Sequence, residues 1–444
     1  MIRTPDQWRD HLLAALAKRR NAYARLRRYY DGDHLLPTAP DLATDKYRRL
    51  AELGVTNMCG LIVDTAVERL VPNGVRLSAT AADDLAAWRD VWQTNGLDGV
   101  IPVGFEEALK VGLCPMLIWP ETVDGETVVS WTIEDPDETI VAYEPGSRRK
   151  RAAALKSFKD DADGTEYATL WLPDAVHAWV KPEGASGWVI DPDETKSGPN
   201  PLGAIPVLEL ASKRNVKNVP APELSTSVLR LQDRINKTMF DAVVGAEDGA
   251  VPQRVTIGIE VETNEAGDPI NPLTPGPGKV FVLDAVDGQE ATAKIDQFDA
   301  YDIAQLISLA EASIKQLAAV SRTSVFYVLA GLTNVGADTI RMADLATSGK
   351  IRGHMTRMSE VLEEGFALAL KVLGKDAPPD IEILWEPIEV RSPAELADAA
   401  IKLSQSGYPF AAIARYVGAT PTEIERIEAE RATADAAAAA PVSS

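Results

Sequence analysis

The sequence predicts an α+β fold in which helical and β-rich stretches alternate along the chain, and three observations predict it. Apolar residues recur at helical spacing over residues 12–92 and again over residues 301–373, whereas short β-type runs fill residues 117–210. Two long amphipathic helices also bracket a small β insert. The 444 residues, 45% apolar and 25% charged, have the length of about three domains and the composition of a folded protein.

Composition excludes several classes of protein. The 45 Lys and Arg against 66 Asp and Glu give a formal net charge of −21, which disfavours tight wrapping of nucleic acid by the whole molecule. The two cysteines, Cys59 and Cys114, cannot form a disulfide framework or a four-thiolate zinc site within one chain. The apolar stretch 12–17 is too short for a signal peptide, and the notable uncharged run 323–337 is too short to span a membrane. We therefore expect a soluble, reduced, intracellular protein.

The N-terminal region, residues 1–215, is predicted to combine helices with a β-rich domain. Residues 1–30 hold eight Lys and Arg against two acids and have apolar residues at helical spacing, which predicts an amphipathic helix with a basic face. That face is either a solvated surface or a nucleic-acid-binding arm. Two further helices are expected around residues 62–70 and 85–92. Short apolar runs separated by Asp, Gly and Pro clusters then predict strands over 117–210.

Two long helices are predicted at residues 223–246 and 300–320, because each segment carries an apolar stripe at helical spacing. The stripe positions are Leu224, Val228, Leu231, Ile235 and Met239 in the first helix, and Ile303, Leu306, Ala310, Ile314 and Leu317 in the second. The insert between them, residues 247–299, contains β-type runs at 255–261 and 279–283 joined by a Pro- and Gly-rich stretch.

Acidic residues gather in and around this insert. From Asp241 to Asp302 there are 13 acids against three bases, a net charge of −10. The group includes Glu260, Glu262, Glu265, Asp268, Asp284 and Asp287. Such a surface either keeps the protein in solution or lines a passage or docking face that like-charged polymers do not adhere to.

The C-terminal part is predicted to be mainly helical. An uncharged segment within residues 321–338, which includes Asn334, Val335 and Gly336, precedes a long helix and a strand over residues 339–390. Residues 391–432 contain two helix starts, each with a hydroxyl cap, a Pro at the first helical position and a Glu that can cap back. Residues 433–444 are Ala-rich and are predicted to be a disordered tail.

Sequence motifs for catalysis, cofactors or metals are absent. Gly331 and Gly336 have the glycine spacing of a phosphate-binding loop, but Ala337 and Asp338 follow where Lys and Ser or Thr are needed. The four histidines share no helix at ligand spacing, and no serine lies in a Gly-x-Ser-x-Gly turn. We therefore predict no enzyme activity, no cofactor and no metal.

An ordered series of motifs resembles the portal (head–tail connector) proteins of tailed double-stranded DNA phages. Each motif is weak alone, and together they cover about residues 5–430. They are YYDGDH at 29–34, NMCGLIVDTAVER at 57–69, NPLGAIPV at 200–207, LRLQDRINKT at 229–238, AVPQR at 250–254, WEP at 385–387 and GATPTEI at 418–424.

The resemblance implies a portal-type fold with named parts. Residues 1–215 would form the wing, the two long helices the stem, and residues 247–299 the clip, whose acids would serve docking or line a channel. Residues 321–338 would hold the tunnel loop, 339–390 the long wing helix and its strand, and 391–432 a helical crown.

The resemblance also implies a function without catalysis. The chain would assemble with itself into a ring of twelve subunits at the capsid vertex of the virion, after a period in the host cytoplasm during assembly, and without membrane contact. Its partners would be the terminase large subunit, the head-completion adaptor, the major capsid and scaffolding proteins, and double-stranded DNA that passes without sequence specificity. Two alternatives stay open from sequence: a phage DNA-processing enzyme that uses carboxylates and a metal, and another, non-portal structural protein of the virion.

Overall fold

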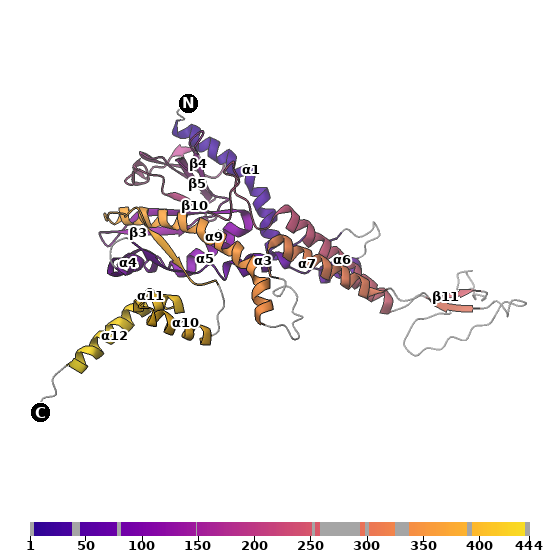
Figure 1. Cartoon of the computed structure of the whole chain (residues 1–444). Helices are drawn as coiled ribbons and strands as arrows, with labels where there is room; N and C mark the ends of the chain where they lie inside the picture. The colour runs from indigo at the N-terminus through magenta and orange to yellow at the C-terminus, as the bar shows by residue number, and fades with distance from the viewer. Residues whose placement is uncertain are drawn as a thin grey trace, which may run out of the picture. The chain divides into compact units, whose positions relative to one another are not determined.

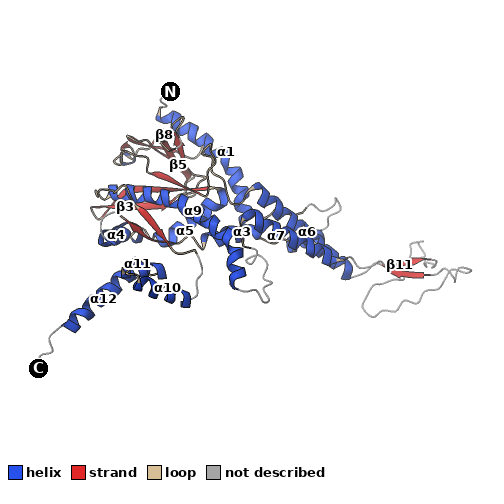
Figure 2. Cartoon of the chain, in the orientation of Figure 1, coloured by secondary structure: helices blue, strands red, loops and turns tan. Residues whose placement is uncertain are grey.

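The computed structural model describes residues 4–37, 45–77, 81–147, 149–250, 254–257, 294–297, 302–324, 337–388 and 393–439 (Figure 1). The described residues contain both helices and antiparallel sheets, which confirms the α+β prediction (Figure 2). The chain divides into two compact units. The first comprises Met1–His34, Asn57–Gln232 and Lys315–Ser444, and the second comprises Leu35–Thr56 and Asp233–Ile314.

Helix α1 (Pro5–Asp31) confirms the predicted N-terminal helix. A capping box begins it: the Thr4 hydroxyl accepts from the backbone N–H of Gln7, and the Gln7 side chain accepts from the N–H of Thr4. Its apolar face is buried through Leu12, Leu16, Tyr23 and Tyr29. Leu12 and Leu16 pack against a β-sheet together with Leu155, Leu170 and Trp179.

A helical layer follows in the sequence. It consists of α3 (Met58–Val67), α4 (Ala81–Ala87), a π-helical turn (Trp88–Gln93) and α5 (Leu97–Val111). The first three correspond to the two predicted helices. Helix α5 was not predicted, because Gly99, Pro102 and Gly104 interrupt its sequence with residues that usually end or weaken a helix. Its Leu97, Ile101 and Phe105 are fully buried.

Two antiparallel sheets form the β-rich region. The first has the order β10-β2-β3 and consists of β2 (Leu113–Val123), β3 (Glu126–Ile133) and β10 (Val207–Ala211). In this sheet Met116 lies opposite both Leu208 and Ile133. The second has the order β4-β5-β6-β7-β8, with β9 also paired to β7.

Four strands of the second sheet, β4, β6, β7 and β8, lie on short apolar runs expected from the sequence, whereas β5 and β9 were not predicted. Its strands are β4 (Thr139–Tyr143), β5 (Arg151–Lys159), β6 (Glu166–Trp171), β7 (Ala175–Lys181), β8 (Val189–Ile190) and β9 (Gly198–Pro199). A short 3₁₀ turn (Glu194–Lys196) lies between β8 and β9. Short apolar runs between Asp, Gly and Pro turns therefore found most of this sheet but missed β5, which lies between β4 and β6.

Helix α9 (Ala337–Val372) is the long helix predicted from residue 339. Phe366 on this helix stacks on Trp88 and Trp92 and meets Trp131 edge-on, which fixes α9 between the helical layer and strand β3. The chain then forms β13 (Glu382–Trp385), which pairs antiparallel with β1 (Pro72–Arg76).

The C-terminal helices are α10 (Pro393–Gln405), α11 (Phe410–Val417) and α12 (Pro421–Ala439). Thr420 and Glu423 form the predicted reciprocal cap at the start of α12. The prediction of a disordered tail from residue 433 is wrong for residues 433–439, because α12 continues to Ala439. The run of alanines there is the best helix-forming sequence available, which explains the extension.

The second unit contains α2 (Asp45–Leu53), strands β11 (Arg254–Ile257) and β12 (Lys294–Gln297), and parts of α6 (Thr226–Ala250) and α7 (Ile303–Ser321). Helix α2 was not predicted. Its Leu50 and Ala51 pack on Phe240 of α6. Gly54 follows α2 and lies against the backbone of Phe240. A Cβ atom at position 54 would lie only 2.8 Å from the amide nitrogen of Phe240, so a side chain does not fit there.

The predicted β insert is described only in part. Strand β11 covers the first half of the alternating run 255–261 and pairs antiparallel with β12 in the register Val255 to Asp296. Strand β12 was not predicted from the sequence. The strand predicted at 279–283 lies outside the described residues.

Candidate functional site

The predicted stripe on α6 lies on the inner side of that helix. Leu224, two residues before the helix starts, and Val228 are nearly fully buried, and Ile235 is completely buried. Leu231 and Met239 are half-buried. The most buried of these positions therefore follow the helical spacing read from the sequence, and the helix starts at Thr226, three residues after the predicted start. Their role in packing a stem remains a prediction.

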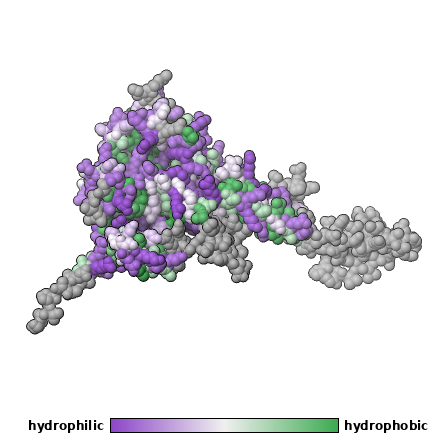
Figure 3. All heavy atoms as spheres, in the orientation of Figure 1, coloured by the Kyte–Doolittle hydropathy of each residue, from purple (hydrophilic) through white to green (hydrophobic). Residues whose placement is uncertain are grey.

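Helix α7 is less well covered. Of its predicted stripe, Ala310 and Leu317 are buried, whereas Ile303, Leu306 and Ile314 are half-buried. Three further large apolar residues are exposed to about half of their surface: Ile307 (48%), Leu309 (51%) and Val320 (52%). Apolar side chains are visible at the surface where α6 and α7 lie (Figure 3). Leu309 and Val320 lie on one side of α7 and form an apolar strip that the described residues leave about half exposed, whereas Ile307 lies on the opposite edge of the buried face.

The length and composition of α7 would also suit a membrane helix. Two stretches of the described residues are long and apolar enough to cross a membrane, Ile303–Ser321 and Tyr47–Val67. The second stretch consists of the two separate helices α2 and α3, and half of it is buried, so it is a composite of core segments. Only 28% of the α7 stretch is buried. This low burial again shows how much of its apolar surface is uncovered.

The other predicted site residues lie outside the described part of the chain. They are the acids Glu260, Glu262, Glu265, Asp268, Asp284 and Asp287, and the residues Asn334, Val335 and Gly336 of the uncharged segment. Their roles remain predictions.

A buried cluster of charges joins α9 to the start of α6. Glu223, which is 8% exposed, precedes α6 and lies among side chains from α9 and from the segment after β10. Its carboxylate oxygens lie 3.8 Å from Lys350 Nζ, 3.4 Å from His354 Nε2 and 3.5 Å from Lys213 Nζ. One acid therefore faces two lysines and a histidine in a site that excludes most water.

The charge state of Glu223 follows from these neighbours. Burial alone would raise the pKa of the carboxyl group, but the contacts with His354, Lys350 and Lys213 outweigh it and lower the pKa to about 2. Burial lowers the pKa of Lys350, and the nearby cations Lys213, Arg322 and Arg69 act in the same direction against the attraction of Glu223. The ionised carboxylate of Glu223 thus balances the positive charge of Lys350 and Lys213 in this buried site.

The ring of His354 is oriented by its neighbours. Its Nδ1 atom lies 3.2 Å from the carbonyl oxygen of Ser212 and 3.2 Å from Arg357 Nη2, while Arg357 Nε donates to the same carbonyl at 2.6 Å. Arg357 can only donate and the Ser212 carbonyl can only accept, so the two contacts of Nδ1 favour different protonation of that atom. The other ring nitrogen, Nε2, faces Glu223 at 3.4 Å.

The same cluster closes the end of α7. Lys350 Nζ donates to the carbonyl oxygen of Ser321 at 3.0 Å and to the Thr323 hydroxyl at 3.4 Å. Arg322 between them takes a left-handed conformation, with φ of 52°, so the helix stops here. Lys350 supplies hydrogen-bond donors to a helix end where backbone carbonyls lack helical partners.

Sequence reasoning missed this cluster. Lys350, His354 and Arg357 stand at positions i, i+4 and i+7 on α9, a spacing that places them on one face of a helix. That spacing was detectable as a basic stripe. Its partners Glu223 and Ser321 are far away in the sequence, so no local pattern could reveal that the stripe is buried.

The basic face of α1 is partly used within the chain. Arg27 pairs with Glu107 of α5 at 2.7 Å and with Asp135 at 2.8 Å, and it also contacts Asp137. Arg19 and Arg20 donate to backbone carbonyls of residues 136–139. These arginines hold the turn between β3 and β4, so they do not form a solvated face or a free nucleic-acid-binding arm.

Within the residues that the structure describes, no three His, Cys, Asp or Glu side chains lie close enough together to hold a metal ion. The buried cluster consists of ion pairs and hydrogen bonds between side chains and backbone. Its geometry suits a structural joint between helices.

Comparisons with known proteins give the family. The family model described as "Phage portal protein, SPP1 Gp6-like" matches residues 9–436. A search of curated proteins gives no match. Among solved structures, a chain of the "Virion of native gene transfer agent (GTA) particle" is similar, with a TM-score of 0.44 and 12% sequence identity over 90% of this chain and 94% of that chain.

The family match settles three of the sequence predictions. Phage portal proteins are structural and not enzymatic, so the alternative of a DNA-processing enzyme is set aside. They act as homo-oligomers assembled with the capsid in the virion. Because the match spans nearly the whole sequence, the chain belongs to the SPP1 Gp6-like family of phage portal proteins, as its motifs predicted.

Proposed function

We propose that copies of this portal protein form a closed ring of twelve subunits around a channel at one vertex of the capsid. Double-stranded DNA enters the capsid through this channel during packaging and leaves through it during ejection. The observation that supports this most is the apolar strip on one side of α7, where Leu309 and Val320 are each about half exposed among the described residues. A face of this kind is expected to be buried by a neighbouring molecule.

A ring follows if the neighbour is another copy. When one surface of a subunit binds a different surface of the next, the contact repeats from copy to copy and closes if the rotation per step allows it. Helix α7 would then pack its free face against a neighbour while its other face stays buried in its own chain. The number twelve comes from the family resemblance.

The charge of the chain fits passive passage of DNA. A net charge of −21 and the excess of acids between Asp241 and Asp302 oppose adhesion of a polyphosphate to the channel wall. In this proposal the acids of residues 247–299 line the exit or form a docking face. Asn334, Val335 and Gly336 would belong to the tunnel loop.

The proposed partners act in sequence. In the host cytoplasm the ring would join the major capsid and scaffolding proteins. The clip, residues 247–299, would dock the terminase large subunit during packaging and the head-completion adaptor afterwards. The wing, long wing helix and crown would be residues 1–215, 339–390 and 391–432, with no membrane contact.

Native mass spectrometry with one substitution and a matched control tests the ring. Leu309→Glu places a charge on the free face of α7 and should shift the purified protein from a ring to monomers near 47.9 kDa. Val123→Glu changes a residue of similar exposure (48%, against 51% for Leu309) in β2 and should leave the ring intact. A ring that survives Leu309→Glu would contradict a role of α7 in assembly.

A second experiment tests the docking role of the insert. Replacing residues 249–296 with a short Gly/Ser linker should leave a folded protein by circular dichroism but abolish terminase-driven packaging in vitro. Packaging at the wild-type level without this segment would refute the clip assignment.

A further inference from the structure

Residues 213–220, between β10 and α6, form a rigid projection that we call the knob. The backbone N–H of Asn215 donates to the carbonyl of Val219 at 3.0 Å, and Ala221 N–H donates to Lys213 at 2.9 Å. The Asn215 side chain accepts from the backbone N–H groups of Lys217 (2.8 Å) and Val219 (3.1 Å). The loop is therefore fixed by its own hydrogen bonds, and the entropy of ordering it is already lost.

The tip of the knob is apolar and its stem is basic. Val216 is 79% exposed and Val219 is 51% exposed, which makes Val216 the most exposed large apolar residue among the described residues. No acid occurs between Ser212 and Pro222, whereas Lys213, Arg214 and Lys217 do. Arg214 pairs with Glu209 at 2.6 Å and Lys213 with Glu223, so the exposed Lys217 carries the cationic character at the tip.

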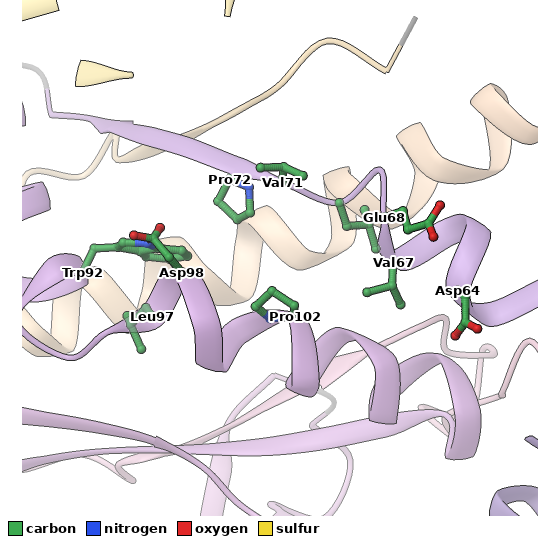
Figure 4. A pocket seen from close by; sticks show the side chains of 10 residues that line it. Asp64, Val67, Glu68, Val71, Pro72, Trp92, Leu97, Asp98 and Pro102 are labelled. Carbon is green, nitrogen blue, oxygen red and sulfur yellow. The ribbon is translucent and has the colours of Figure 1, made fainter. Parts of the chain in front are cut away.

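An apolar groove with acidic residues at its side lies between α3, β1 and α5 (Figure 4). It has a volume of about 450 Å³ and is lined mainly by apolar side chains, namely Val67, Leu70, Val71, Pro72, Trp92 and Leu97. Its polar lining is acidic and consists of Asp64, Glu68 and Asp98.

The backbone at the groove also favours a partner that carries a hydrogen-bond donor. Pro102 lies inside α5 and lines the groove. Because proline has no N–H, it cannot give the carbonyl oxygen of Asp98 the hydrogen bond that the residue four positions later normally supplies. The groove therefore presents two exposed carboxylates, Glu68 and Asp98, and a carbonyl without its usual helical donor beside an apolar floor. Asp98 also accepts a hydrogen bond from Trp92 Nε1 at 2.6 Å, which leaves Glu68 as the acid for an incoming cation. A short apolar tip beside a lysine matches this combination.

We propose that the knob of one copy inserts into the groove of the next copy, with Val216 on the apolar floor and Lys217 beside Glu68. This inference rests on the proposed ring and adds a second contact to that of α7. A second copy is the favoured occupant because one chain carries both the apolar cationic projection and the apolar acidic groove. Two different surfaces that bind each other give the head-to-tail contact that a ring requires.

Cysteine cross-linking tests the contact directly in the full-length protein. Val216→Cys and Val71→Cys place thiols on the knob tip and in the groove, and the natural Cys59 and Cys114 are buried and give little background. A mixture of the two single variants, joined by a short bifunctional maleimide, should give a covalent dimer. The double variant should give a ladder of higher oligomers, because each copy then links to two neighbours.

The matched control replaces the groove position by a distant exposed one. Val123→Cys, on β2 and 48% exposed, should give no ladder when combined with Val216→Cys. Native mass spectrometry on the same samples shows whether a ring is present. Rings without a ladder above the control would overturn the knob-in-groove contact alone, whereas the absence of rings in the wild type would overturn the proposed function and this contact with it.

Charge reversal gives an independent measurement. Lys217→Glu should raise the protein concentration at which half of the rings form by about tenfold, since it places a like charge beside Glu68. Adding Glu68→Lys should restore assembly by re-forming the pair with opposite polarity. If the second substitution weakens assembly further, the two side chains do not meet in the ring.

Discussion

Lys350, near the middle of α9, donates a hydrogen bond of 3.0 Å to the carbonyl oxygen of Ser321, the last residue of α7. A single buried side chain on α9 therefore caps the C-terminal end of α7. Glu223, just before α6, supplies the opposite charge at 3.8 Å. The start of α6, the end of α7 and the middle of α9 therefore meet at one cluster of buried charges. We expect the free energy of unfolding to depend on each charged side chain of this cluster.

Lys350→Met should destabilise the fold by about 2–3 kcal/mol. The substitution keeps the apolar stem but removes the donor to Ser321 and one of the cations that balance buried Glu223. The control Lys402→Met breaks the exposed pair of Lys402 with Asp398 and should change stability by less than about 0.5 kcal/mol. Chemical denaturation followed by tryptophan fluorescence at one protein concentration measures both, and equal effects would contradict a special role of Lys350.

Acid should destabilise the joint through Glu223. Its pKa is lowered from 4.5 to about 2 in the folded protein, so its contribution is complete above pH 4.5 and disappears as the pH falls towards 2. This shift corresponds to about 3 kcal/mol as an upper estimate. Glu223→Gln should therefore be less stable than the wild type at pH 7 and lose less stability on acidification. Thermal melting across pH 7 to 3 checks this, and parallel pH profiles for the two proteins would contradict it.

Two glycines of α9 should respond oppositely to the same substitution. A methyl group at Gly365 would overlap the ring of Trp131, so Gly365→Ala should destabilise by about 1–3 kcal/mol. A methyl group at Gly349 meets nothing within 4 Å, so Gly349→Ala should stabilise the helix by about 0.5–1 kcal/mol. Melting temperatures of the two variants test the packing of α9 on β3. Stabilisation by Gly365→Ala would show that this packing is wrong.

DNA should bind the free protein weakly and in a strongly salt-dependent manner. The net charge of −21 opposes binding, and Arg19, Arg20 and Arg27 of the basic helix are already engaged within the chain. Fluorescence anisotropy with a labelled duplex at several salt concentrations measures this. Nanomolar affinity at physiological salt would contradict passage without adhesion.

Local sequence patterns predicted the elements that have one solvent-facing side. The stripe of α6 follows from helical periodicity, and strands β4, β6, β7 and β8 follow from short apolar runs between turn residues. Strand β5 was missed. Helix α5 escaped prediction because Gly99, Pro102 and Gly104 interrupt its helical signal, and β1 escaped because its partner β13 lies about 300 residues away. Helix α2 is short, and its packing on Phe240 is a contact between distant segments.

In the candidate site, too, features with a local periodic pattern were predicted and contacts between distant segments were not. The apolar residues of α6 and α7 were found by spacing, and Ile235 and Ala310 are buried as the stripe predicts. The charged joint was not found, because the chemistry of Glu223 depends on Lys350 and His354, which a local pattern cannot bring together. The exposed face of α7 needed the structure, since hydrophobicity alone does not distinguish covered from uncovered apolar residues.

Negative-stain electron microscopy of the purified full-length protein tests the central claim most directly. We expect class averages of closed rings with twelve subunits around a central opening, formed by the protein alone at micromolar concentration. Particles of about 48 kDa without a central opening, or open filaments in place of rings, would contradict it.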